Sequence, residues 1–297
     1  MSATLRTLCF IARHPLNRRS PLKAVGRFFA WQIATRLGPG AFVVPYVGET
    51  RLLVTRGMTG ATGNVYCGLH EFEDMAFVLH ALRPEDLFVD VGANVGSYTI
   101  LASGAAGARC ISFEPAPSAY RALLDNIRLN DLLYRVEARN ECLAAAPGEV
   151  QLTSGLDTVN HVVMHPQNGV DTVRVAVTTL DAALAGRAPA IIKIDVEGYE
   201  TAVIDGADET LRAGSLRAVL MELNGSGARY GFDERRLHQR MLRYDFIPAA
   251  YEPARRELRV REWRGSTGGN LLYVRDLESL RPRLAAAARR ALHGTFL

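Results

Sequence analysis

The stretch that decides the fold is Leu87-Phe88-Val89-Asp90-Val91-Gly92-Ala93-Asn94-Val95-Gly96. An apolar run reaches a carboxylate, Asp90, and a glycine turn follows directly. Residues 97–102, which come next, favour the start of a helix. A buried strand, a tight turn and a helix in this order form a crossover in which a nucleotide-like ligand approaches the backbone. We therefore expect this turn to bind a cofactor.

The residues of the turn indicate which cofactor it binds. A dinucleotide-binding turn would follow the pattern G-x-G-x-x-G, but Asn94 and Ser97 occupy the second and third glycine positions. Asp90 would also place negative charge beside a pyrophosphate, whereas S-adenosylmethionine carries an ammonium and a sulfonium that a carboxylate favours. The turn thus predicts this methyl donor, with Asp90, Gly92, Asn94 and Gly96 at its site. An NAD-dependent oxidoreductase is the weaker alternative.

The second signal follows the apolar run 110–113, where Glu114 and Pro115 come next. Ligands of open parallel sheets bind beyond the carboxyl ends of the strands, so Glu114 and Asp90 can meet at one cofactor. A carboxylate in this place can accept hydrogen bonds from both ribose hydroxyls of an adenosyl group. The alternative for Glu114 is an ordinary turn residue before proline.

The third signal is the run Ile191-Ile192-Lys193-Ile194-Asp195-Val196-Glu197-Gly198-Tyr199-Glu200. Strand alternation places Lys193 and Asp195 on one side, with Asp195 at the carboxyl end where a substrate would lie. Asp195 is therefore the first candidate for orienting or deprotonating a substrate hydroxyl. Lys193 and Glu197 are candidates for substrate contact. The structural alternative pairs Lys193 with Glu197 or Glu200, because a charge in an apolar run needs a partner.

Three further polar residues complete the candidate site. Glu222 ends the apolar run 217–223 and is a catalytic candidate. Asn160 and His161 lie in a polar segment that we expect to form a loop or hairpin over the cofactor, with Asn160 contacting the substrate. Because a histidine ordinarily titrates at about 6.5, His161 is the second candidate for the base. The alternative is a loop histidine in a local hydrogen bond.

A divalent metal is a competing interpretation of the same polar residues. Asp195, Glu197, Glu222 and His161 are all hard or borderline ligands. The sequence shows no geometry for them, and we predict no metal. Four cysteines without a C-x-x-C pair favour neither a zinc site nor a disulfide framework.

The apolar runs predict an α/β fold. Runs at 87–91, 110–113, 190–194 and 217–223 alternate with helical or loop segments, as in a doubly wound, mostly parallel sheet with helices on both faces. Helical spacing marks a helix that begins at Glu71 and another over 117–129. Apolar segments at 42–44 and 51–54 predict a hairpin. Residues 280–293 predict a surface helix.

The chain has 297 residues, 48% of them hydrophobic, which suffices for a large core. Its net charge of +4 is uneven, because residues 1–48 hold seven basic side chains and no acid. Residues 21–37 predict a basic amphipathic helix with an apolar face of Leu22, Val25, Phe29 and Ile33. This face needs a partner, which is either an anionic surface such as a membrane or acidic protein, or the protein's own core.

Other observations bear on partners and location. No apolar run approaches the roughly 18–20 residues of a membrane span, so we expect a cytoplasmic protein with peripheral membrane contact at most. A nucleic-acid-binding protein, with or without methylation, is the alternative that the basic arm supports. No recognised RNA-binding signature accompanies that arm, so nucleic acid is the less favoured partner.

Taken together, these residues resemble the FkbM family of S-adenosylmethionine-dependent methyltransferases. The matching motifs are Asp90–Gly96, Phe113–Pro115, Asn126 with Asn130, Thr179–Asp181, Lys193–Glu200, Met221-Glu222 and Asn270–Tyr273. The resemblance covers residues 65–277 and leaves 1–64 as a basic extension and 278–297 as a C-terminal segment. It implies a class I, Rossmann-like methyltransferase fold and O-methylation of a hydroxyl on a sugar, glycan or natural product. It also implies that Asn140 and Glu141 border the adenine.

Overall fold

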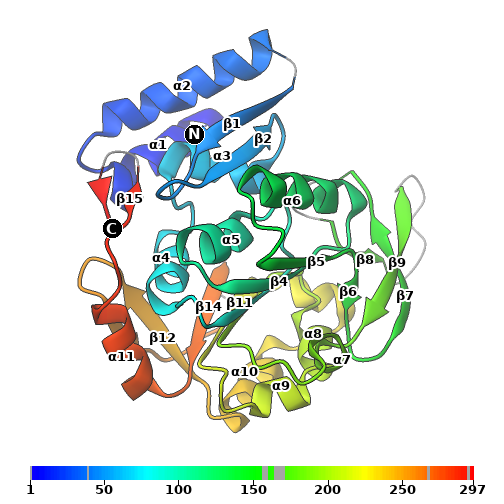
Figure 1. Cartoon of the computed structure of the whole chain (residues 1–297). Helices are drawn as coiled ribbons and strands as arrows, with labels where there is room; N and C mark the ends of the chain where they lie inside the picture. Colours follow the sequence, from blue (N-terminus) through cyan, green and yellow to red (C-terminus); the bar gives the residue numbers. More distant parts are fainter. Residues whose placement is uncertain (1, 39, 156–159, 164–170, 266–267, 293–294) are drawn as a thin grey trace.

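The computed structural model describes residues 2–38, 40–155, 160–163, 171–265, 268–292 and 295–297 (Figure 1). Within them, the largest sheet has eight strands. In spatial order these are β13 (Glu257–Val260), β12 (Ile247–Glu252), β14 (Gly269–Val274), β11 (Ala218–Leu223), β10 (Ile191–Ile194), β3 (Leu87–Val91), β4 (Arg109–Phe113) and β5 (Val136–Arg139).

The order of the strands places the predicted site. Strand β3 pairs in parallel with β4 on one side and with β10 on the other, so the chain order reverses at β3. In open α/β sheets, ligands bind at this switch point, beyond the carboxyl ends of the strands. Strand β14 runs antiparallel between β11 and β12. The prediction of a doubly wound, mostly parallel sheet is confirmed.

Helices cover both faces of this sheet. Alternation along β3 points Phe88 into one apolar cluster and Val89 and Val91 into the other. The helices and helical turns described after residue 67 are α4 (Phe72–Ala81), α5 (Ser97–Ile100), η2 (Leu101–Ala105), α6 (Pro117–Leu129), α7 (Leu180–Leu184), α8 (Glu200–Asp205), α9 (Asp208–Arg212), η4 (Ser226–Tyr230), α10 (Glu234–Arg243) and α11 (Leu277–Ala285).

A smaller sheet follows β5 at one end of the large one (Figure 1). Its strands, in spatial order, are β6 (Cys142–Leu143), β9 (Thr172–Thr178), β7 (Gly148–Thr153) and β8 (Val162–Val163). Asn160 and His161 come directly before β8, which pairs antiparallel with β7. Residues 156–159 of the loop or hairpin expected around them lie outside the described residues.

The N-terminal residues form a layer that packs on the same core. It comprises α1 (Ala3–Arg13), η1 (Pro15–Asn17), α2 (Pro21–Leu37), the hairpin β1 (Ala41–Pro45) and β2 (Arg51–Thr55), and α3 (Thr59–Cys67). The predicted hairpin and the predicted helix over 21–37 are confirmed.

The sequence left open whether the face of Leu22, Val25, Phe29 and Ile33 packs on the core, and the structure turns a different face of α2 to the core. Helix α2 buries Phe28 and Trp31, while Phe29 and Ile33 are exposed. The Phe28 ring lies 5.2 Å from that of Tyr66, and the Trp31 ring lies 5.6 Å from that of Phe42. The ring contacts with Tyr66 and Phe42 stabilise the inner face that Phe28 and Trp31 form.

The predicted surface helix over residues 280–293 has the wrong bounds. Helix α11 ends at Ala285, and residues 291–292 form β15 (Ala291–Leu292), which pairs with β16 (Thr295–Phe296). The helix begins early because the Asp276 side chain accepts a hydrogen bond from the Ser279 amide. Leu280 and Leu284 are buried in the core, so α11 is no free surface helix. Among the described helices, none is both long enough and apolar enough to cross a bilayer.

Candidate active site

The glycine turn after β3 is held between the ends of its two neighbouring strands. The amides of Gly92 and Ala93 both donate to the Phe113 carbonyl, at 3.0 and 2.9 Å. Gly92 has a φ of +77°, and a Cβ there would collide with the Asp195 carbonyl oxygen. Only glycine fits such a position, so the turn brings bare backbone against the end of β10.

The predicted residues of this turn divide into two groups. Gly92 and Asn94 line a pocket at the carboxyl ends of the strands. Gly96 does not line it, and a Cβ there would lie 2.7 Å from a Leu123 methyl, so this glycine allows α6 to pack closely. Asp90 is fully buried beneath the turn, where it accepts a hydrogen bond of 2.7 Å from Thr99. The structure thus places Asp90 as a support of the turn rather than in the pocket wall.

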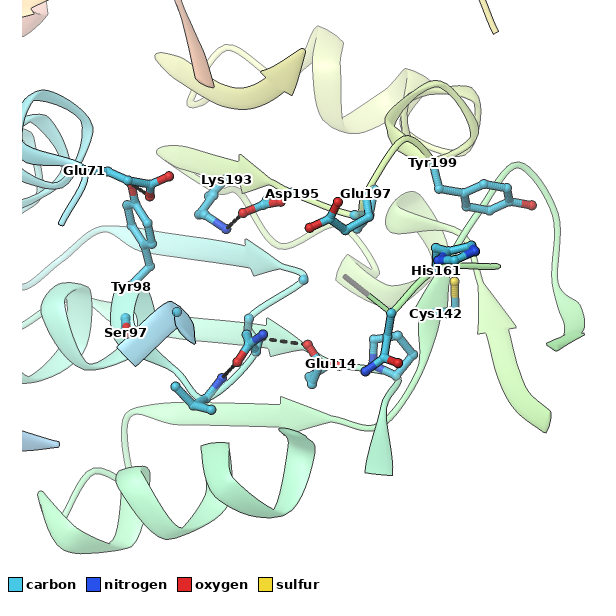
Figure 2. A pocket seen from close by; sticks show the side chains of 18 of the residues that line it. Glu71, Ser97, Tyr98, Glu114, Cys142, His161, Lys193, Asp195, Glu197 and Tyr199 are labelled. Atoms are coloured by element: carbon cyan, nitrogen blue, oxygen red, sulfur yellow. Dashed lines mark hydrogen bonds and ion pairs between the residues drawn. The ribbon is translucent and has the colours of Figure 1, made fainter. Parts of the chain in front are cut away.

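Glu114 lies where the second signal predicted it, in the pocket wall beside Pro115 (Figure 2). Its Oε2 accepts from the Asn94 amide at 2.7 Å, and its Oε1 accepts from the Ala116 amide at 2.8 Å. Burial raises the pKa of Glu114 to about 7. Each carboxylate oxygen has further acceptor capacity, which two ribose hydroxyls can use.

The two residues expected to border the adenine lie outside the pocket wall. Asn140 donates to the backbone carbonyls of Glu114 and Pro115, at 2.8 and 3.0 Å, and so braces the segment that carries them. Glu141 forms an ion pair of 3.8 Å with Arg139. Cys142, the next residue along, lines the pocket instead.

The end of β10 carries a buried ion pair. Lys193 Nζ lies 3.0 Å from Asp195 Oδ2, and the Lys193 side chain is 5% exposed. The ammonium also lies 5.0 Å from the centre of the Tyr98 ring. The alternative partners for Lys193, Glu197 and Glu200, are therefore wrong.

The charge state of Lys193 follows from its neighbours. Burial acts to lower the pKa of Lys193, but the carboxylates of Asp195, Asp90 and Glu71 outweigh burial and raise that pKa above its ordinary value. The ammonium stays protonated at neutral pH and cannot serve as a proton acceptor.

Three carboxylates gather beside this ion pair. One oxygen from each of Asp195, Glu197 and Glu222 lies within 4.8 Å of the other two. Burial and the charge of Asp195 raise the pKa of Glu197 to about 7, and the same two causes raise the pKa of Glu222 further above its usual range. Glu197 adopts a φ of +54°, in the left-handed region that a non-glycine residue rarely enters. Such strain is found at functional sites.

These carboxylates differ in how they face the pocket. Asp195 and Glu197 line it, and Figure 2 shows their side chains side by side at its edge. Glu222 does not line it, but its Oε2 is buried and has no hydrogen-bond partner among the described residues. The set has the residue types and spacing of a divalent-ion site, although His161 is not part of it.

The small sheet brings Asn160 and His161 to the pocket, where both lie in its wall. The His161 amide donates to Thr153 Oγ1 at 2.9 Å. Figure 2 shows His161 near Cys142 and Tyr199, on the side of the pocket away from Glu71 and Tyr98. The structure therefore brings the glycine turn after β3 and the end of β10 into one pocket with Asn160 and His161, which were predicted to cover it.

Sequence analysis did not predict the side of the pocket that lies at the start of α4. Glu71, interpreted only as an acid in the first turn of a helix, lines the pocket together with His70, Asn64 and Tyr98. Glu71 accepts hydrogen bonds from the Tyr98 hydroxyl at 2.8 Å and from Asn270 at 3.0 Å. No local pattern marks this role, because its two partners lie 27 and 199 residues further along the chain.

The charges of the pocket wall are unbalanced. Glu71, Glu114, Asp195 and Glu197 face a single cation, Lys193, among the described lining residues. Asp195 already pairs with that cation. A wall with this excess of carboxylate attracts a positively charged ligand and disfavours a pyrophosphate.

Comparison with known proteins identifies the family. Residues 90–248 match the family described as the Methyltransferase FkbM domain, which is more than half of the chain. The protein belongs to the FkbM methyltransferase family, as its motifs predicted. Its doubly wound sheet agrees with the class I methyltransferase fold that the resemblance implied.

Two curated relatives are similar to this chain. The methyltransferase sdnD of Sordaria araneosa is 26% identical over 172 residues, which are 46% of this chain and 66% of the relative. The 31-O-demethyl-FK506 methyltransferase FkbM of Streptomyces tacrolimicus is 30% identical over 176 residues, with the same two coverages of 46% and 66%. The match thus spans just under two thirds of each relative.

Solved methyltransferase structures are also similar. The C-terminal domain of precorrin-6Y C5,15-methyltransferase from Rhodobacter capsulatus has a TM-score of 0.39 at 19% identity, over 69% of this chain and 87% of that one. TYW2 of P. horikoshii, in complex with MeSAdo, has a TM-score of 0.41 at 12% identity, over 80% and 70% of the two chains.

S-adenosylmethionine is the cofactor that the family assignment implies, and the residues present fit it. Gly92 and Asn94 line the pocket, and Glu114 lies one strand away with acceptor capacity for a ribose. The remaining carboxylates suit an ammonium and a sulfonium. When bound, this cofactor supplies an electrophilic methyl group.

Proposed function

We propose that this protein is an S-adenosylmethionine-dependent O-methyltransferase whose acceptor is a hydroxyl of a sugar, glycan or natural product. The observation that carries the proposal is the carboxylate set of Asp195, Glu197 and Glu222, of which Asp195 and Glu197 line the pocket. A hydroxyl oxygen must lose its proton when it is methylated, and this set offers acceptors whose pKa burial has moved toward neutrality.

The residues of the chain divide the work as follows. Glu114 and the turn at Gly92 hold the donor, and Asp195 orients the acceptor hydroxyl. The proton passes to the carboxylate set while the oxygen–carbon bond forms and the sulfur–carbon bond breaks. Lys193 holds Asp195 in place, since their charged atoms lie 3.0 Å apart and the lysine side chain is buried. Most of the acceleration would come from alignment of oxygen, methyl carbon and sulfur.

His161 is the second candidate for the proton acceptor, because it lines the same pocket from the small sheet. The wall of the pocket favours a neutral hydroxyl over an anionic acceptor, because its carboxylates would repel a phosphate or a carboxylate. The carboxylates of the pocket wall also disfavour nucleic acid as the methyl acceptor. They have no bearing on what the basic N-terminal layer binds.

The proposal is tested by incubating the purified protein with methyl-labelled S-adenosylmethionine and a panel of acceptors. The panel contains glycosides, hydroxylated macrolactones, amines and an oligonucleotide. We expect label on a hydroxyl as an ether that is stable to mild base, together with release of S-adenosylhomocysteine. Label on nitrogen or on a base-labile ester alone would refute O-methylation. Isothermal titration that detects NAD but no S-adenosylmethionine would refute the cofactor.

A further inference from the structure

Helix α2 carries an apolar face that the fold leaves uncovered. Four of its large apolar side chains are solvent-exposed: Leu22 by 87%, Phe29 by 50%, Ile33 by 57% and Leu37 by 82%. At 3.6 residues per turn, these positions fall on one stripe. Phe28 and Trp31 fill the opposite, buried side. The core is therefore packed without the exposed stripe.

The surroundings extend this apolar surface. Figure 1 shows α2 along the outer edge of the molecule, beyond α1 and the β1–β2 hairpin. An apolar groove of about 500 Å³ lies between α2 and β1, and its lining includes Ala30, Ala34, Phe42 and Val43. Val43 is itself 51% exposed. Helix and groove together present aliphatic and aromatic groups to water.

Basic side chains accompany the stripe. The exposed ones in the N-terminal layer before the hairpin are Arg6, Arg13, Arg18, Arg19, Lys23 and Arg36. In the described part of the chain, none of these six forms an ion pair. The first acid of the sequence is Glu49. The layer thus combines a hydrophobic stripe with an uncompensated positive charge.

We propose that α2 docks the protein on an anionic lipid membrane. The stripe of Leu22, Phe29, Ile33 and Leu37 enters the boundary between headgroups and acyl chains, and the basic side chains contact lipid phosphates. This occupant matches both features at once. A second copy of the chain would bring two basic surfaces together, which repel. A nucleic acid would match the charge but leave the apolar stripe in water.

The test uses the full chain, because removal of residues 1–37 would also remove the buried Phe28 and Trp31. Protein is sedimented with vesicles of phosphatidylcholine, with and without phosphatidylserine. We expect strong partitioning only onto the anionic vesicles, and release as salt increases. The double variant Phe29→Ser/Ile33→Ser should lower the partition coefficient at least about tenfold, because both side chains lose their burial in lipid.

Matched variants separate the two contributions. Lys23→Glu with Arg19→Glu should weaken binding to anionic vesicles and remove most of its salt dependence. Val260→Ser, at a 57% exposed position on edge strand β13, should leave partitioning unchanged. Circular dichroism and thermal melts confirm that each variant is folded.

Three results would overturn the proposal. In the first, wild-type protein stays in the supernatant with anionic vesicles. In the second, Phe29→Ser/Ile33→Ser partitions like Val260→Ser. In the third, sedimentation velocity shows a wild-type dimer that the double variant loses, which would assign the stripe to a second copy. None of these measurements depends on methyl transfer, so their outcome is independent of the proposed function.

Discussion

Glu114 shows how one carboxylate is prepared for a ligand. Its two oxygens accept hydrogen bonds from the Asn94 and Ala116 amides, which fixes the side chain toward the pocket. Replacement by alanine removes the acceptors proposed for the ribose hydroxyls. We expect Glu114→Ala to weaken binding of S-adenosylmethionine and S-adenosylhomocysteine by about 1.5–3 kcal/mol, the range for hydrogen bonds to a charged group. Isothermal titration measures the effect.

The matched control is Glu141→Ala, since Glu141 is an acid between β5 and β6 that does not line the pocket. Its dissociation constants should stay within about twofold of wild type, as for a surface change. Equal dissociation constants for Glu114→Ala and wild type, in folded protein, would make Glu114 a turn residue only.

Asp195 is the residue on which the proposed chemistry depends. Asparagine keeps its shape and removes its charge, so Lys193 loses its closest carboxylate. We expect Asp195→Asn to lower turnover by roughly 10²–10⁴, the contribution of a positioned general base, while donor affinity stays within a few-fold. Steady-state kinetics on the acceptor found in the panel, with titration of the donor, give both values. Full turnover in this variant would remove Asp195 from the mechanism.

His161→Ala tests the competing base. If His161 took the proton, the wild-type rate would have a pH limb at about 6–7, and this variant would lose it. We expect the limb to persist in His161→Ala, because Glu197 titrates in the same range. A chelator completes the experiment: we expect activity to survive it. Loss of activity that Mg²⁺ restores would reassign the three carboxylates as metal ligands.

At the scale of elements, the turn between β10 and α8 depends on Glu200. Its Oε1 accepts from the amides of Val196 and Gly198, at 3.2 and 3.1 Å, and the residue is only 4% exposed. Burial raises the pKa of Glu200 from 4.5 to about 7, although these hydrogen bonds oppose the shift. The folded state therefore holds a proton that the unfolded state releases between these pH values.

This proton gives stability a defined pH dependence. Because the raised pKa belongs to the folded state, its contribution is complete below pH 4.5 and is lost as pH rises to about 7. We expect Glu200→Gln, which keeps the Oε1 acceptor, to reduce this fall by up to about 1.4 kcal/mol per pH unit. Urea unfolding at several pH values measures it. The exposed Glu209→Gln is the control, and identical pH profiles for the two variants would contradict the assignment.

At the scale of the whole molecule, the N-terminal layer shares its core with the central sheet. Trp31 is 7% exposed and belongs to the same apolar cluster as Phe88 of β3. We expect Trp31→Ala to lower the free energy of unfolding by about 3–5 kcal/mol, as for other buried large-to-small changes, in a single transition. Urea denaturation followed by circular dichroism measures the change.

Ile33→Ala, two residues further along α2 on the exposed face, should change the same free energy by less than about 0.5 kcal/mol. Two separate transitions, with donor binding retained after the first, would instead show that residues 65–277 fold without the layer. That result would support the domain boundary predicted at residue 64.

The turn after β3 was predictable from local sequence. An apolar run, an acid and glycines dictate a strand and a tight turn, because only glycine tolerates the contact between Gly92 and the Asp195 carbonyl. Apolar runs likewise sufficed for β3, β4, β10 and β11, and helical spacing sufficed for α6. The order of motifs in the chain was enough to predict the family.

Tertiary structure decided how the polar residues divide between pocket and support. Glu71 lines the pocket, whereas Asp90, Asn140 and Glu141 lie outside its wall. Neighbouring strands and hydrogen bonds between distant residues determine which side chains face the ligand. The same holds for α2, where helical spacing predicted an amphipathic helix but not which face is buried. Phe28 and Trp31 form the buried face because they pack against Tyr66 and Phe42, which lie in later elements of the chain.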